Sequence, residues 1–203
     1  MGTRYFYRLC CEYISPSFNL EYHLMRITKV VTRNGDKGQT NLAQGDLVSK
    51  NEPIINAIGD VDELNSVLGV CNSFCSNDAI LKDIKTIQND LFNIGGEISL
   101  NDSDKKLLKD ESLLFLDNKI DEMNNLLEPL KEFILPGGDS FSSNLHLARS
   151  VARRAERSVV ELYAGSLENN NIVKYLNRLS DYLFVLSRFY NKNNNIDENM
   201  WEK

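Results

Sequence analysis

Five long segments with helical periodicity constrain the fold of this 203-residue chain more than any other feature. In the clearest of them, which begins near Asn77, apolar residues recur in alternating steps of four and three, so they form one continuous seam along a helix. The seam consists of Ile80, Ile84, Ile87, Leu91, Ile94 and Ile98. Gly95 and Gly96 interrupt it and allow close packing against a neighbouring helix. Strand-type alternation is nearly absent, and the chain is therefore predicted to form an all-α five-helix bundle.

The other four helical segments carry their own boundary signals. The segment over 53–74 follows Ser49 and Glu52, which have the spacing of a capping box, and has proline in its first turn. The segment over 113–130 stops before a Pro-Gly-Gly turn, and the next is expected to be capped by Ser142 or Ser143. The expected buried positions are Ile54, Ile58, Val61, Leu64, Leu68 and Cys71; Leu113, Leu116, Ile120, Met123, Leu127 and Leu130; and Ile172, Tyr175, Leu176, Leu179, Leu183, Leu186 and Tyr190.

The composition argues against several classes of protein. The formal net charge of -6 and the pI near 5.0 disfavour a nucleic-acid binder, which would present a basic face over the whole domain. The four cysteines form no Cys-x-x-Cys pair and the chain has only two histidines, so neither a zinc site nor a di-iron bundle is supported. Free cysteines fit a reducing compartment. No apolar run approaches the roughly 20 residues that cross a bilayer, so no membrane partner is expected.

The two ends of the chain differ from its middle. Residues 1–24 match neither a secretory signal nor an acid-free transit peptide, so they are expected to be a disordered extension, with Met25 as an alternative start. Residues 25–192 are expected to form one domain, in which a short extended segment ending at Val31 leads into a glycine-rich loop. Residues 193–203 are interpreted as a polar tail. A cytoplasmic location is expected, or the mitochondrial matrix if residues 1–24 are a transit peptide.

The fourth helical segment carries an unusual row of charges. Helical spacing of four places Arg149, Arg153 and Arg157 on one stripe of an otherwise apolar helix. Three guanidinium groups in register suit a multiply charged oxyanion such as a polyphosphate. The same residues also suit a solvated face, or a salt-bridge network with Glu156 and Glu161 as partners. The spacing alone leaves these interpretations balanced.

The polar residues of one loop and two acidic residues of the first helical segment each allow a structural or a functional interpretation. The loop from Thr32 to Thr40 combines glycines with Arg33 and Lys37, so its N–H groups and cations could wrap phosphate oxygens, although such a run is more often an ordinary turn. Asp62 is either a surface charge or the partner of an arginine, within the chain or across a subunit boundary. Glu63 is interpreted as a hydrated surface charge.

Five sequence blocks in a fixed order resemble the PduO-type ATP:cob(I)alamin adenosyltransferases. They are Thr32–Thr40 (TRNGDKGQT), Gly59–Asn65 (GDVDELN), Phe133–Gly138 (FILPGG), Arg153–Arg157 (RRAER) and Asn177–Asp181 (NRLSD). The resemblance spans about residues 26–191. It implies a five-helix bundle that assembles as a homotrimer, with ATP bound in the cleft between adjacent subunits.

The resemblance also implies roles for individual residues. Arg153 would hold phosphate during transfer, and Asp62 would pair with Arg149 across the subunit interface. Phe133 would bind cobalamin and displace its lower axial ligand. These four are the expected catalytic residues. The expected ATP-binding residues are Thr32, Arg33, Asn34, Gly35, Asp36, Lys37, Gly38, Thr40, Asn41 and Lys50 from the N-terminal half of the site, and Arg153, Arg154, Glu156, Arg157 and Asn177 from the other half.

The implied reaction transfers the 5′-deoxyadenosyl group of ATP to the cobalt of cob(I)alamin and yields adenosylcobalamin and triphosphate. Cobalt is itself the nucleophile, so the protein supplies position and charge stabilisation. Mg2+ is expected to be held mainly through the ATP phosphates. Expected partners are a reductase for cob(II)alamin and an enzyme that uses adenosylcobalamin. The alternative function is a trimeric carrier or sensor that binds nucleotide or adenosylcobalamin without catalysis.

Overall fold

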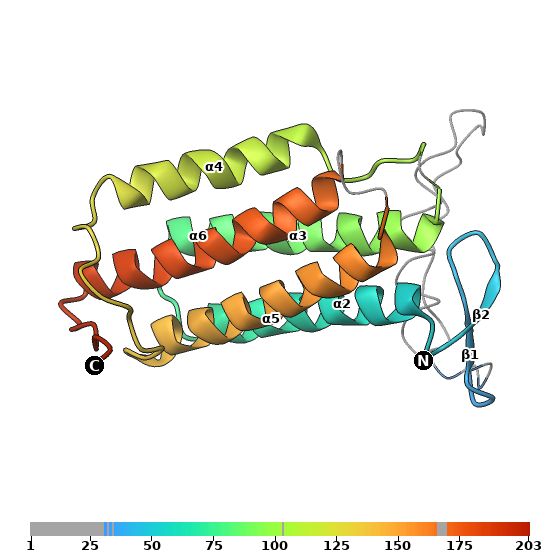
Figure 1. Ribbon diagram of the computed structural model, residues 1–203, viewed down its shortest axis with the longest axis horizontal. Coiled ribbons are helices and arrows are strands. Elements are labelled where there is room, and N and C mark those ends of the chain that lie inside the picture. The colour runs from blue at the N-terminus through green and yellow to red at the C-terminus, as the bar shows by residue number, and fades with distance from the viewer. Residues whose placement is uncertain (1–30, 32, 34, 103, 166–169) are drawn as a thin grey trace.

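The described part of the chain forms a five-helix bundle with a two-stranded sheet at one end (Figure 1). The computed structural model describes residues 31, 33, 35–102, 104–165 and 170–203. Residues 1–30, Thr32 and Asn34 lie outside this set; they carry the predicted N-terminal extension, nearly all of the predicted extended segment and two residues of the predicted ATP site. The elements are β1 (Gln39–Asn41), β2 (Leu47–Ser49), α2 (Pro53–Asn72), α3 (Asp78–Leu100), α4 (Asp110–Asn124), α5 (Ser140–Leu162) and α6 (Asn171–Asn193). The predicted five-helix bundle is confirmed.

The helices contact each other in the order α3, α2, α5, α6 and α4, and the sheet is an antiparallel hairpin (Figure 1). The hairpin, which the sequence analysis did not predict, lies beyond the end of the bundle where α2 begins. The Ala43 N–H lies 3.0 Å from Ser99 Oγ, and the Gln44 side chain donates to the Leu100 carbonyl oxygen at 3.0 Å. These contacts anchor the hairpin to the C-terminal end of α3.

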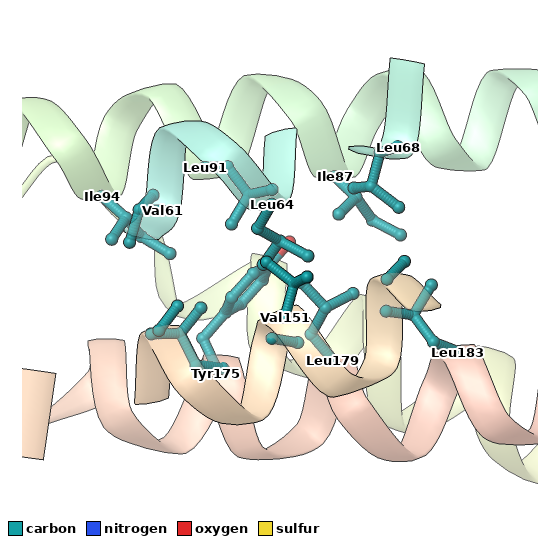
Figure 2. Packing of buried hydrophobic residues seen from close by; sticks show 14 of the residues in the cluster. Val61, Leu64, Leu68, Ile87, Leu91, Ile94, Val151, Tyr175, Leu179 and Leu183 are labelled. Carbon is teal, nitrogen blue, oxygen red and sulfur yellow. The ribbon is translucent and has the colours of Figure 1, made fainter. Parts of the chain in front are cut away.

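The predicted apolar seams of α2, α3 and α6 form most of the core, with Tyr190 half-buried at its edge (Figure 2). Of the positions predicted to be buried in α4, only Leu116 and Met123 are buried; Ile120 is half-buried against the core, and Leu113 is half-buried outside it. All six seam positions of α3 are buried, and α2 and α6 present leucines to them. Gly95 and Gly96 are buried within α3. Because burial of apolar side chains is the main favourable contribution to folding, these seams determine how the helices assemble.

One polar network crosses the core. The Tyr175 hydroxyl donates to Asp90 Oδ2 at 3.1 Å, and Ser112 Oγ donates to Asp90 Oδ1 at 2.9 Å. Asp90 is 7% exposed, and burial raises the pKa of its carboxyl group. The network joins α3, α4 and α6, so it fixes how the outer helix α4 sits on the bundle.

The helix caps differ from those predicted. Ser49 lies in β2, and α2 has no side-chain cap, so the predicted capping box is wrong. The cap of α5 is Asp139 rather than Ser142 or Ser143, because its carboxylate accepts the Ser142 N–H at 2.8 Å. In contrast, α3 begins where it was predicted to begin: Asn77 precedes its first residue and caps it, with its side-chain oxygen accepting two main-chain N–H groups.

The third predicted helix is too long. α4 ends at Asn124, so Leu127 and Leu130 lie in the following connection. Leu127 still packs against the core, whereas Leu130 is 39% exposed. Apolar spacing continued past the end of the helix, and it concealed the boundary that Asn124 and the C-cap residue Asn125 mark.

Candidate functional site

The predicted arginine stripe lies along α5. Arg153 and Arg157 are exposed, and Arg157 Nη1 donates to the Arg153 carbonyl oxygen at 2.9 Å. Arg149 is partly buried, with its guanidinium carbon 5.9 Å from the centroid of the Phe184 ring. Burial and the charge of Arg153 lower the pKa of Arg149.

These three arginines lack counter-ions in the described part of the protomer. No ion pair there includes any of them, and Arg149 Nε is buried without a hydrogen-bond partner. The salt-bridge alternative with Glu156 and Glu161 is therefore not what the structure contains. The stripe remains available for a bound anion or for a carboxylate of another subunit.

Glu156 instead contacts the neighbouring helix. Its Oε1 accepts a hydrogen bond from Asn177 Nδ2 of α6 at 3.0 Å. Two residues to which the family resemblance gives a role in ATP binding are thus adjacent, one on α5 and one on α6. They lie beside the helical turn that carries Arg153 and Arg157.

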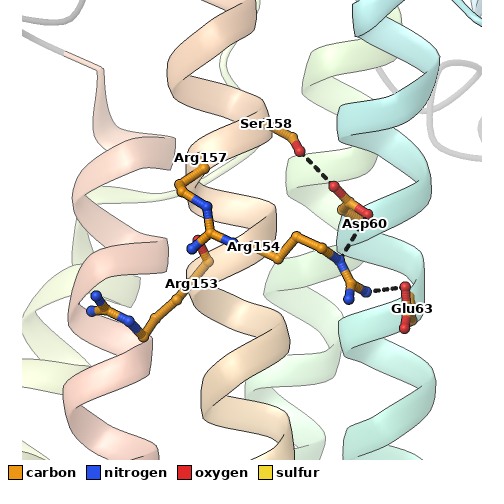
Figure 3. Close-up of polar contacts among 6 residues, drawn as sticks. All are labelled: Asp60, Glu63, Arg153, Arg154, Arg157 and Ser158. Carbon is orange, nitrogen blue, oxygen red and sulfur yellow. Dashed lines mark hydrogen bonds and ion pairs between the residues drawn. The ribbon is translucent and has the colours of Figure 1, made fainter.

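Arg154 points away from the stripe (Figure 3). Its Nε lies 3.3 Å from Asp60 Oδ1, and its Nη2 pairs with the Glu63 carboxylate, both on α2. Ser158 Oγ donates to Asp60 Oδ2 at 2.5 Å. Figure 3 shows Arg153 and Arg154 extending to opposite sides of α5. The interpretation of Glu63 as a hydrated surface charge is wrong, because it holds an arginine.

Asp62 lies on the exposed side of α2. Its carbonyl oxygen accepts the Ser66 hydroxyl at 3.0 Å, while its carboxylate forms no ion pair with the described residues. Partial burial raises the pKa of Asp62. It does not pair with Arg149 within one protomer, and the pair across a subunit boundary stays a prediction.

The glycine-rich loop is built from tight turns. Arg33 and Gly38 have positive φ angles of 58° and 78°. The Gly38 N–H donates to the Gly35 carbonyl oxygen at 3.2 Å, and the Lys50 N–H donates to the Gly38 carbonyl oxygen at 2.9 Å. A Cβ at Gly35 would lie 2.8 Å from Lys50 Nζ, so a glycine there lets the lysine approach the loop.

The remaining loop residues complete one cationic element. Asp36 and Lys37 are exposed, and Thr40 and Asn41 lie in β1. The Asn41 side chain donates to the Gly45 carbonyl oxygen at 2.7 Å and so closes the hairpin. No hydrogen bond or ion pair between described residues joins this element to the arginine stripe. Within one protomer, the described residues thus provide no polar contact between the two predicted halves of the ATP site.

The connection between α4 and α5, which carries Phe133, lies at the opposite end of the bundle from the hairpin (Figure 1). Phe133 is 74% exposed. The chain after α6 folds back against it: the Trp201 N–H donates to the Phe133 carbonyl oxygen at 2.7 Å, and the Leu135 N–H donates to the Asn199 carbonyl oxygen at 2.8 Å. The Trp201 and Phe133 ring centroids are 6.2 Å apart. Residues 193–203, interpreted from sequence as a polar tail, thus support the Phe133 loop.

A buried arginine connects this tail to the loop. Arg188 is 8% exposed, and its Nη2 donates to the Glu128 carbonyl oxygen at 3.0 Å. Its Nε pairs with Glu198 at 3.2 Å. Because a buried charge needs partners, Arg188 ties both segments to α6.

Gly138 joins the Phe133 loop to α5. Its φ is 111°, and a Cβ there would lie 2.3 Å from Ser142 Oγ and 2.9 Å from Asn191 Oδ1. Only glycine fits this conformation and this space without a shift of the neighbours. The turn therefore places the loop directly against the capped start of α5.

No group of three or more histidine, cysteine, aspartate or glutamate side chains in residues 31, 33, 35–102, 104–165 and 170–203 is placed to hold a metal ion. No helix in the same residues is long and apolar enough to cross a membrane.

Comparison with known proteins decides the family. The model of the cobalamin adenosyltransferase family matches residues 30–190. The chain belongs to this family. A cobalamin adenosyltransferase from Cupriavidus metallidurans is 42% identical over 182 residues, which are 88% of this chain and 96% of the relative. A corrinoid adenosyltransferase from Bacillus subtilis is 38% identical over 180 residues, which are 86% of this chain and 93% of the relative.

A solved structure of the same family has the same fold. It is a variant PduO-type ATP:corrinoid adenosyltransferase from Lactobacillus reuteri, complexed with cobalamin and ATP. It is 34% identical, gives a TM-score of 0.79, and covers 86% of this chain and 97% of its own. The resemblance drawn from the five sequence blocks is confirmed.

Proposed function

We propose that this member of the family transfers the 5′-deoxyadenosyl group of ATP to the cobalt of cob(I)alamin. The observation that carries the proposal is the uncompensated stripe: Arg149, Arg153 and Arg157 have no anionic partner in the described chain. A triphosphate supplies the anions that the stripe lacks. The names of the relatives, and the cobalamin and ATP in the related structure, support the same reaction.

The chemistry requires no base and no protein nucleophile. The electron pair of cob(I)alamin attacks C5′ of ATP, and a cobalt–carbon bond forms as the C5′–oxygen bond breaks. The triphosphate leaves with the bonding electrons, and its new charge is stabilised by the arginines. Each such contact lowers the barrier by about 2–4 kcal/mol, as preorganised donors to a developing anion do. Mg2+ would arrive with the phosphates and share this charge.

A homotrimer would complete the site. In one protomer no hydrogen bond or ion pair between described residues links the loop cations to the α5 arginines. The Asp62 carboxylate and the Arg149 guanidinium are also both without ion pairs among the described residues. A neighbouring copy that sets its Asp62 against Arg149 would pair both charges. The same contact would bring Arg33, Lys50 and the rest of the loop to the stripe of the next subunit.

Phe133 fits a role at the lower face of the corrinoid. Its ring is largely exposed, while its main chain is fixed by the hydrogen bond from Trp201. An aromatic ring in this position occupies the volume that the lower axial ligand needs. Cobalt without that ligand offers an incoming electron a lower-lying empty orbital, so cob(II)alamin is easier to reduce. A separate reductase would supply the electron, and an adenosylcobalamin-dependent enzyme would take the product.

An anaerobic assay tests the proposal. The purified chain is mixed with ATP, Mg2+ and chemically reduced cobalamin, and the spectrum is followed for adenosylcobalamin while triphosphate is quantified. The proposal predicts equal amounts of both products. Arg153→Ala should lower turnover with little change in melting temperature. Lys119→Ala is the control: it removes a cation paired with Asp83 on the other side of the bundle, and turnover should stay unchanged. Binding of adenosylcobalamin without any product would favour the carrier alternative.

A further inference from the structure

Two consecutive arginines of α5 have different surroundings. Arg153 is exposed and forms no ion pair in the described chain, whereas the Arg154 guanidinium lies between two carboxylates of α2 (Figure 3). Arg154 has its counter-ions already, so a phosphate would have to compete with Asp60 and Glu63 for it. We call Asp60, Glu63, Arg154 and Ser158 the bracing cluster.

The bracing cluster fixes both the rotation of α5 about its axis and its position along that axis relative to α2. Arg154 and Ser158 are one turn apart on α5, and Asp60 and Glu63 are nearly one turn apart on α2. Two contacts at different heights resist sliding as well as rotation. Consecutive helical residues are separated by about 100° around the axis, so a rotation that released Arg154 would carry Arg153 with it.

Several α5 side chains buried near the bracing cluster are small. They include Ala148, Ala152 and Ala155, all with no exposed surface. Hydrophobic packing is not directional, whereas a hydrogen bond or ion pair weakens when its geometry changes. The polar contacts of the bracing cluster therefore add a directional restraint to the packing of α5 on α2.

The cluster also reaches the other half of the proposed site. Asp62, the residue expected to meet the next subunit, stands on α2 between Asp60 and Glu63. The turn of α2 that carries Asp62 is therefore tied to the turn of α5 that carries Arg153. One cluster sets the position of a subunit contact and of a phosphate-binding arginine together.

We propose that Arg154 is a positioning residue, not an ATP ligand, and that the bracing cluster holds Arg153 and Asp62 in register for transfer. The inference rests on the proposed function. The side chains of Arg154 and Glu63 are 42% and 52% exposed, and ion pairs with such exposure contribute little to stability. The contribution of the cluster is therefore to geometry, and its loss should appear in turnover.

A charge swap separates the possibilities. Arg154→Glu, Glu63→Arg and the double variant are compared with wild type for kcat, KM for ATP, melting temperature and trimer mass. Each single variant should lower kcat about 10- to 100-fold, the size expected when reacting groups are displaced by about 1 Å. The double variant restores one cation and one anion across the same gap and should return to within about threefold of wild type.

Other outcomes overturn the inference. If Arg154 binds ATP, the double variant stays as impaired as Arg154→Glu, because the cation is now on α2. If the cluster is only structural, melting temperatures fall while kcat and KM below melting are unchanged.

Ser158→Ala provides a second measurement in case the charge variants fail to fold. It removes one contact without changing charge, and it should lower kcat with KM for ATP unchanged. Unchanged kcat in Ser158→Ala would contradict the inference. A wild-type chain with no transferase activity would overturn the proposed function itself, whereas an active wild type without rescue overturns only the role of Arg154.

Discussion

Replacing Gly138 with alanine tests how the Phe133 loop is positioned. An alanine at φ 111° is strained by about 1–3 kcal/mol, the usual cost of a disfavoured backbone conformation. Its Cβ would also lie 2.3 Å from Ser142 Oγ, and overpacking of this kind costs a further 1–3 kcal/mol or so. Gly138→Ala should therefore lower the free energy of unfolding by about 2–6 kcal/mol.

Gly165→Ala is a matched control. Gly165 has a similar φ of 98°, but among the described residues no atom of a neighbour lies within 4 Å of the position of its Cβ. It should show the backbone strain alone, so Gly138→Ala should be less stable by the overpacking contribution of about 1–3 kcal/mol. Chemical denaturation at one fixed protomer concentration measures both, since assembly makes stability depend on concentration. Equal losses in the two variants would refute the packing argument at Gly138.

Three further predictions follow from the site and the core. Phe133→Ala should slow conversion that starts from cob(II)alamin more than conversion that starts from cob(I)alamin in anaerobic kinetics; equal slowing would remove its role in ligand displacement. Tyr175→Phe should lower the free energy of unfolding by about 1.5–3 kcal/mol, because Asp90 loses a buried hydrogen bond, and denaturation that showed no loss would contradict this. Burial raises the pKa of Asp90 above 3.8, so ionisation of this carboxyl group opposes folding. In pH-dependent denaturation, the free energy of unfolding of wild type relative to Asp90→Asn should be greatest below about pH 4 and should fall as the pH rises through the folded pKa. The opposite slope would show that the hydrogen bonds to Asp90 outweigh its burial.

The helices could be predicted because their signal is local and repeated. The apolar residues of each seam lie within one continuous segment, so their spacing predicted both the helices α3 and α6 and most of the residues that each helix buries. The cap of α5 was missed because Asp139, Ser142 and Ser143 are all residues that cap helices, and only the geometry of the Pro-Gly-Gly turn selects Asp139.

Contacts between distant segments could not be predicted in this way. Trp201 and Phe133 are joined by a hydrogen bond between main-chain groups, which every residue has. No side chain of the tail therefore indicated this contact, and the composition of the tail indicated only a polar segment. The partners of Arg154 lie on α2, more than ninety positions away, and helical spacing could not choose between them and a bound phosphate. The family resemblance supplied the roles of the stripe, while the structure separated Arg154 from it.

Mixing two inactive variants tests the central claim that each site is shared by neighbouring subunits. One variant is Arg153→Ala, and the other is the loop variant Arg33→Ala/Lys50→Ala. If α5 of one subunit meets the loop of the next, every mixed trimer contains one site with both halves intact, so randomly reassembled equal mixtures should recover about one quarter of wild-type activity. Activity that stays at the level of the separate variants, although mass measurement shows mixed trimers, would contradict the account.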